Sequence, residues 1–237
     1  MREIIIETES MARFNQTADT ALEAGKMSSG FVLAYGKAGR GKSVAADRYY
    51  YERGGAYVRV WQNWSQSAFL QRLLFEVRGK NMDMPRHNGN RCKELIVEVL
   101  ENDPKPLFID EADRLSIDRI EDLRDIFEMT GVPVVLIGEE GIWGLLRERR
   151  RIMSRVAYEV EFMPISPTEA SIFLKQAANL NVSPDLCLKI TKQADGDFRV
   201  VRNIALQLEK AAKASEKYEV DTAMLETAFS NIIHKKK

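Results

Sequence analysis

The sequence predicts an α/β fold in which a parallel sheet has helices on both faces, followed by a small all-helical domain. Short apolar runs alternate with segments of helical periodicity from residue 31 to about residue 162, a pattern typical of a parallel sheet with crossover helices. After Phe162 no further strand is predicted, and MPISPTEA begins a helical tail. We therefore expect an N-terminal helix leading into the core (1–30), an α/β core (31–163) and a C-terminal helical lid domain (164–237).

The individual elements follow from periodicity and from the residues that begin and end helices. The first helix is expected at 8–25, with Thr8 or Ser10 as its N-cap and Gly25 at its end. Strands are expected at 31–35, 56–60, 106–110, 132–138 and 157–162. Core helices are expected at 42–53, 66–78, 90–101 and 117–129, and tail helices near 167–179, 184–194, 199–215 and 220–233.

Composition narrows the class of protein. Hydrophobic residues make up 45% and charged residues 30% of the 237 residues, which indicates a globular chain. The formal net charge is zero, so any contact with nucleic acid has to come from a local patch. No apolar run approaches the ~20 residues that cross a bilayer. Cys92 and Cys187 lack metal-ligand spacing, so we expect reduced structural thiols in a cytoplasmic protein with no membrane contact.

A glycine-rich loop follows the first strand and precedes a helix. Residues 36–43, GKAGRGKS, fit the pattern G-x-x-x-x-G-K-[ST]. Glycines let successive backbone N–H groups converge on phosphate oxygens, and the positive end of the following helix dipole adds to this attraction. Lys42 is expected to reach the β- and γ-phosphates and Ser43 to hold Mg²⁺. The predicted ATP-binding residues are Gly36, Lys37, Ala38, Gly39, Arg40, Gly41, Lys42, Ser43 and Val44.

An acidic pair ends a later apolar strand, in LFIDEAD at 107–113. We expect Asp110 to hold Mg²⁺ through water. We expect Glu111 to orient and deprotonate the attacking water, as a positioned base does in phosphoryl transfer. Such a pair is often structural when it stands alone, but its place after a phosphate loop favours an ATP-hydrolysing site. The same placement disfavours a small-molecule kinase, which would need a separate acceptor pocket.

With these motifs in place, nearly the whole chain resembles the AAA+ ATPases. VPVVLIGEE (132–140) is similar to the sensor-1 strand, SRV (154–156) to the arginine-finger motif, and GDFRVVRNI (196–204) to sensor 2. The resemblance implies a homo-oligomeric ATPase that uses ATP and Mg²⁺ and turns over slowly unless DNA or a partner stimulates it. It also implies catalytic roles for Arg155, acting in a neighbouring subunit, and for Arg199.

Within this class, residues 113–146 resemble the transposition ATPases, the group of phage Mu transposition protein B and its relatives in bacterial transposons. That resemblance implies assembly on double-stranded DNA as a homo-oligomer or helical filament, selection of target sites and stimulation of a transposase. The phage Mu protein has an additional N-terminal DNA-binding domain. About 30 residues precede the phosphate loop here, so we expect DNA contacts to come from the ATPase domain itself.

Two alternative functions stay open. A helicase loader or replication initiator shares the same motifs and would have a helicase as its partner. A nucleotide-gated assembly module without hydrolysis is the other, because Glu139 stands where the sensor-1 residue of this class is usually small and polar. A carboxylate there would repel a γ-phosphate unless it turned toward a cation.

Five arginines lie between Leu146 and Val156. Arg155 is the favoured finger because it follows Ser154 at the start of the last strand, and Arg151 is the second choice. Arg147 and Arg149 are expected on a solvated surface. Contact of Arg149–Arg151 with DNA phosphates is a less favoured alternative to a place at the subunit interface.

DNA contacts are expected in the segment RGKNMDMPRHNGNR at 78–91, through Lys80, Arg86 and Arg91. Lysine and arginine on such a loop bind phosphates without reading bases, although an ordinary surface loop stays open as an interpretation. Trp61 and Trp64 follow the second strand and are able to stack on bases, but we favour packing of both against the core.

Overall fold

The computed structural model describes residues 1–27, 30–79 and 87–232. Contacts between Cα atoms divide the chain into two compact units. The α/β unit contains Ser10–Lys37 and Gly41–Phe162, and the helical unit contains residues 1–9, residues 38–40 and the chain from Met163 onward. Residues 1–9 were expected to lead into the α/β core, but they group with the helical unit instead.

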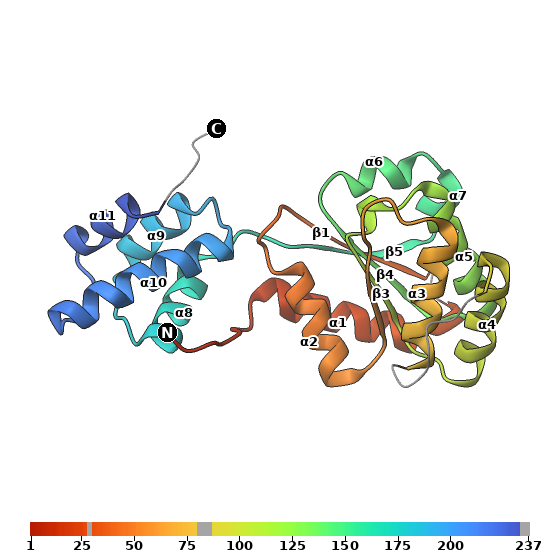
Figure 1. Cartoon of the computed structure of the whole chain (residues 1–237). Coiled ribbons are helices and arrows are strands. Elements are labelled where there is room, and N and C mark those ends of the chain that lie inside the picture. The colour runs from red at the N-terminus through yellow and green to blue at the C-terminus, as the bar shows by residue number, and fades with distance from the viewer. Residues whose placement is uncertain (28–29, 80–86, 233–237) are drawn as a thin grey trace. The chain divides into compact units, whose positions relative to one another are not determined.

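A five-stranded parallel sheet is the centre of the α/β unit (Figure 1). Its strands occur in the order β2-β3-β4-β1-β5. From β1 the chain crosses to β2 at one side of the sheet, and from β3 it returns through β4 toward β5 at the other side. The first and last residues of each strand lie within two residues of the positions expected from the sequence. The bounds are β1 (Phe31–Tyr35), β2 (Ala56–Arg59), β3 (Leu107–Asp110), β4 (Val134–Gly138) and β5 (Val156–Glu161).

Helices cover both faces of this sheet, as the alternation of side chains along β1 requires. Phe31 and Leu33 point into one core with α3 (Gln66–Arg78), α4 (Gly89–Asn102) and α5 (Ile117–Thr130). Two short helices that the sequence did not predict, α6 (Ile142–Arg147) and α7 (Arg150–Met153), pack on the same face. Val32 and Ala34 point into the other core with α1 (Glu9–Ala24) and α2 (Lys42–Arg53).

The helical unit contains α8 (Pro167–Ala178), α9 (Pro184–Gln193), α10 (Phe198–Ser215) and α11 (Thr222–Ser230). Each helix begins after a capping side chain, and Ser166 forms a reciprocal capping box with Glu169. The N-terminal segment joins this unit through Ile6, which is buried in its core, and through an ion pair of 2.6 Å between the Met1 ammonium and Glu209. No helix among the described residues is long and apolar enough to cross a membrane.

Strand register brings the predicted motifs of the α/β unit to one edge of the sheet. Arg59 lies opposite Asp110, Asp110 opposite Ile137, and Gly138 opposite Tyr35. Because parallel strands end on the same side, the loops after β1, β3 and β4 meet at their carboxyl ends, where ligands of open α/β sheets bind.

Candidate nucleotide-binding site

The predicted phosphate loop connects β1 to α2, and its three glycines all have positive φ, a backbone conformation that favours glycine. Gly41 has φ +92° and precedes the first residue of α2, which no side chain caps. The first N–H groups of a helix have no partner within it, so the beginning of α2 presents donors to an anion. Gly36 has φ +145°, and a Cβ there would lie 2.7 Å from the carbonyl oxygen of Phe162. This loop conformation therefore depends on both glycines.

Lys42 is buried at the start of α2 and its ammonium points back along the loop. Its Nζ donates to the backbone oxygens of Gly36 at 2.5 Å and Lys37 at 2.9 Å. Burial lowers the pKa of Lys42, while the carboxylates of Glu139, Asp110, Asp113 and Glu111 oppose that shift. The ammonium thus donates to two carbonyl oxygens that a phosphate group is able to replace.

Asp110 is the most enclosed carboxylate of the site, with 2% of its surface exposed. One oxygen, Oδ1, accepts from the Ser43 hydroxyl at 3.1 Å and from the Glu111 backbone N–H at 3.0 Å. The fold thus brings together the two residues predicted to share Mg²⁺, although 67 positions separate them in the chain. A hydroxyl and a carboxylate beside a phosphate site suit Mg²⁺, which prefers a few oxygen ligands completed by phosphate and water.

Two residues that the sequence analysis missed hold the other oxygen of Asp110. Its Oδ2 accepts from the Tyr57 hydroxyl at 2.7 Å and from Arg59 Nε at 2.9 Å. Burial and the hydrogen bond to Asp110 raise the pKa of Tyr57 above its ordinary value, which keeps this phenol a donor. No motif in the sequence marks Tyr57 and Arg59, because their role depends on the pairing of the edge strand β2 with β3.

Glu111 follows β3 in a left-handed backbone conformation, with φ 59°. Such a conformation is uncommon for a residue other than glycine, asparagine or aspartate, and it recurs at functional sites. The Glu111 carboxylate pairs with Arg114 at 3.2 Å and is about one-third exposed. Glu111 is therefore next to Asp110 and open to solvent, as a base that activates water has to be.

Glu139 begins the loop after β4. Its backbone N–H donates to Asp113 Oδ1 at 3.2 Å, and the approach is so close that a Cβ on Gly138 would lie 2.5 Å from that oxygen. Among the charges that act on Lys42, Glu139 has the largest effect. Its carboxylate thus favours the charged form of Lys42, and whether an acid at this position slows hydrolysis stays a prediction.

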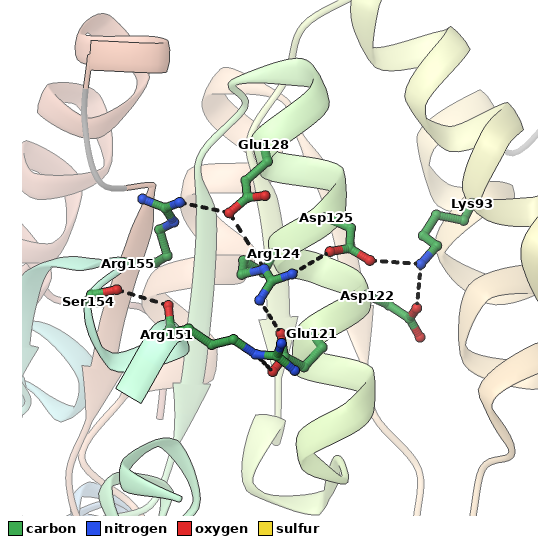
Figure 2. A network of polar contacts seen from close by, with 9 residues as sticks. All are labelled: Lys93, Glu121, Asp122, Arg124, Asp125, Glu128, Arg151, Ser154 and Arg155. Carbon is green, nitrogen blue, oxygen red and sulfur yellow. Dashed lines mark hydrogen bonds and ion pairs between the residues drawn. The ribbon is translucent and has the colours of Figure 1, made fainter. Parts of the chain in front are cut away.

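Figure 2 shows the two candidate finger arginines turned toward α5. Arg155 donates to Glu128 at 2.8 Å, and Arg151 donates to Glu121. Arg124 lies between these two acids on α5 and pairs with Glu121 at 2.6 Å. Arg155 and Glu128 are each about 40% exposed, so this surface pair is weak and exchangeable.

Other predicted residues lie outside this group or outside the described residues. Lys80 and Arg86 belong to the part of the chain that the structure does not describe. Arg91 lies in the first turn of α4 and pairs with Glu94 at 2.8 Å. Arg199 lies in the helical unit at the start of α10, where it pairs with Asp197 at 3.0 Å. The catalytic role expected of Arg199 stays a prediction, as do the roles of the other site residues.

The two tryptophans after β2 behave differently from each other. Trp64 packs against the core of the α/β unit, as favoured, but Trp61 is 66% exposed, so the prediction that it packs against the core is wrong. The two rings lie 5.6 Å apart between centroids, inclined by 31°.

Comparison with known proteins gives one family match and two curated relatives. The model of the AAA domain matches residues 25–146. A potential ATP-binding protein of Staphylococcus aureus is 25% identical over 137 residues, which cover 54% of this chain and 50% of that protein. The Mu-like prophage FluMu DNA transposition protein B of Haemophilus influenzae is 27% identical over 164 residues, covering 64% of this chain and 54% of that protein. The matches thus span about half the length of each relative.

Solved structures show the same fold. Cdc6p from Pyrobaculum aerophilum has a TM-score of 0.68 at 16% identity, over 99% of this chain and 70% of its own. The ADP form of the Aeropyrum pernix ORC2 protein has a TM-score of 0.70 at 16% identity, over 98% and 70%. These matches confirm the predicted fold class, a phosphate-loop parallel sheet with helices on both faces and a C-terminal helical region. Together with the family match and the transposition relative, they confirm the predicted resemblance.

Proposed function

The chain belongs to the AAA domain family, and we propose that within it the chain is an ATP-dependent DNA-binding ATPase that regulates transposition. In this proposal it is a cytoplasmic protein that assembles on double-stranded DNA, selects target sites and stimulates a transposase. The observation that carries the ATPase part is the meeting of Ser43 and Asp110 beside the buried Lys42. The transposition part is supported by the likeness to the Haemophilus influenzae prophage protein, which is named a DNA transposition protein.

The residues of the site suit the steps of ATP hydrolysis. The phosphates occupy the beginning of α2, and Lys42 exchanges the carbonyls of Gly36 and Lys37 for phosphate oxygens. Ser43 and Asp110 would hold Mg²⁺, which would neutralise charge on the phosphates. Glu111 leaves Arg114, accepts a proton from the attacking water and orients it toward the γ-phosphate.

Assembly completes the site in this proposal. Arg155 exchanges Glu128 for the γ-phosphate bound by a neighbouring subunit, where a positive charge stabilises the transferring phosphoryl group. Arg199 supplies a second positive charge from the helical unit. Hydrolysis is then slow for isolated protomers and faster for protomers assembled on DNA.

Binding to labelled duplex DNA tests this function, with ATP or ADP and at increasing salt concentrations. We expect binding only with ATP, little dependence on base sequence and a steep loss of affinity as salt rises, because phosphate contacts release counterions. Electron microscopy of the same samples distinguishes a filament from a closed ring. Equally tight, salt-insensitive binding with ADP would contradict the proposal.

One observation favours a second candidate, an assembly module gated by ATP binding alone. Glu139 follows β4 at the same end of the sheet as the phosphate loop, with its N–H on Asp113, and its carboxylate opposes the burial-driven lowering of the Lys42 pKa; a carboxylate there repels a γ-phosphate. Single-turnover measurements on DNA-bound protein separate the two candidates. Assembly with ATP but no release of phosphate over many assembly cycles would favour the module.

A further inference from the structure

The loop after β2 carries an exposed aromatic platform. Trp61 exposes 66% of its surface, while Trp64 is half-buried and packs against the core of the α/β unit. The centroids of the two rings lie 5.6 Å apart with an inclination of 31°. Single exposed aromatic residues are common on protein surfaces. Here, however, the exposed ring is supported by a second ring that the core holds in place.

The neighbours of this platform in the chain are neutral hydrogen-bonding groups. The segment VWQNWSQ (60–66) has no charged residue. Ser65 caps α3 by accepting from the Ala68 N–H, and Gln66 donates to Asp122. Gln62 and Asn63, which lie between the two tryptophans in the chain, are exposed. Amide side chains both donate and accept, as the edges of bases do, and no carboxylate in this segment repels a phosphate.

One guanidinium links this loop to the predicted catalytic base. Arg114 donates through Nη1 to the carbonyl oxygen of Val60 at 3.2 Å, and its Nη2 pairs with Glu111 at 3.2 Å. Val60 immediately precedes Trp61. A ligand that displaces the Trp61 loop therefore acts on the arginine that holds Glu111.

We propose that Trp61, supported by Trp64, stacks on a nucleobase, so that the protein binds DNA containing unpaired bases more tightly than a fully paired duplex. This proposal rests on the proposed DNA-binding function. In a duplex, neighbouring base pairs cover both faces of each base, so an aromatic ring gains a stacking partner only where pairing is interrupted. Aromatic side chains bind single-stranded nucleic acid in this sequence-tolerant way.

The surroundings of Trp61 favour a base over a protein segment. Interface hot spots are enriched in tryptophan too, but they lie at the centre of well-packed, desolvated patches. Apart from the tryptophans and Val60, which is buried, the loop consists of amide and hydroxyl residues. An exposed ring whose neighbours in the chain are amide residues suits both the face and the edge of a base.

Two labelled duplexes of equal length test this inference, one fully paired and one with a central run of mismatched bases. Binding is measured by fluorescence anisotropy with Mg²⁺ and a non-hydrolysable ATP analogue. We expect the parent to bind the mismatched DNA about tenfold more tightly. Trp61→Ala should bind both DNAs equally, and Trp61→Phe should keep part of the preference. The matched control is Tyr51→Ala, which removes an aromatic side chain that is 89% exposed on α2 and should behave as the parent.

A second readout is the rate of ATP hydrolysis with each DNA. Mismatched DNA should stimulate the parent more than paired DNA does, and Trp61→Ala should lose this difference, because Arg114 connects the loop to Glu111. Thermal melting checks that each variant is folded.

The possible outcomes distinguish the proposed base stacking by Trp61 from the proposed DNA-binding function on which it rests. If the parent binds both DNAs equally, or if Trp61→Ala keeps the preference, the proposed stacking of Trp61 on a base is wrong, while the proposed DNA binding is unaffected. If the parent binds neither DNA with nucleotide, both proposals are wrong. If Trp61→Ala binds both DNAs as the parent does but no longer stimulates a transposase, the surface docks a protein.

Discussion

At the scale of single residues, Lys42 is held by oxygens that a nucleotide replaces. Its ammonium donates to the carbonyls of Gly36 and Lys37, and the free energy of binding ATP depends on exchanging these for charged phosphate oxygens. We expect Lys42→Ala to weaken ATP binding about ten- to hundredfold, measured by titration with a fluorescent ATP analogue. Arg48→Ala is a suitable control, because Arg48 pairs with Glu52 on the surface of the same helix. An unchanged affinity of Lys42→Ala for ATP would contradict the assignment of residues 36–43 as a phosphate-binding loop.

Glu111 should separate binding from hydrolysis. Glu111→Gln keeps the size of the side chain but cannot accept a proton at neutral pH. We expect ATP affinity to stay near the parent value and hydrolysis to fall about 10²–10⁴-fold, so that the ATP-bound assembly accumulates. Phosphate release and DNA binding, measured on the same preparation, check both parts. Hydrolysis at the parent rate would show that another residue is the base.

The motif residues of this site could be predicted from the sequence, but the residues that hold them in place could not. Asp110 and Ser43 were predicted because each occupies a fixed place in a short pattern. Tyr57 and Arg59, which hold Asp110 Oδ2, belong to no such pattern, and their role depends on the pairing of β2 with β3. Trp61 was expected to pack against the core, whereas the turn after β2 leaves it exposed.

At the scale of elements, the strands were predictable as short apolar runs, and the long helices were predictable because they have helical periodicity and most have a capping residue. The short helices α6 and α7 were not predicted, since six and four residues are too few to show a period. The grouping of residues 1–9 depends on Ile6 and Met1 meeting residues far along the chain. No local pattern reports such contacts.

The phosphate loop also gives a prediction about stability. A Cβ at Gly36 would lie 2.7 Å from the Phe162 carbonyl oxygen, at a φ of +145° that L side chains rarely adopt. We expect Gly36→Ala to lower the free energy of unfolding by about 1–3 kcal/mol and to weaken ATP binding. Gly144→Ala is the matched control, because Gly144 lies within α6 with nothing near its Cβ position and alanine favours a helix. Equal melting temperatures for the two variants would contradict the expected clash.

At the scale of the whole molecule, the proposed arginine finger involves two protomers, because Arg155 of one protomer acts in the nucleotide site of its neighbour. Arg155 pairs with Glu128 on the surface of its own α/β unit, and exposed ion pairs contribute about 0–1 kcal/mol to stability. Arg155→Ala should therefore melt close to the parent and bind ATP normally. Its hydrolysis and its ATP-dependent assembly should both fall strongly, because the finger serves the neighbouring site. A large loss of thermal stability would instead assign Arg155 to the fold of its own unit.

Mixing two inactive variants tests whether Arg155 acts across the interface. Protomers with Arg155→Ala keep a sound phosphate loop and Glu111, whereas protomers with Glu111→Gln keep Arg155 but lack the base. In a mixed assembly, some interfaces place an intact Glu111 opposite an intact Arg155, so hydrolysis should partly return. Recovery requires the finger to act in trans, since neither chain has both residues. If the variants co-assemble and stay inactive, Arg155 does not serve its neighbour. Arg151, which pairs with Glu121 on the same helix α5, is then the next residue to exchange.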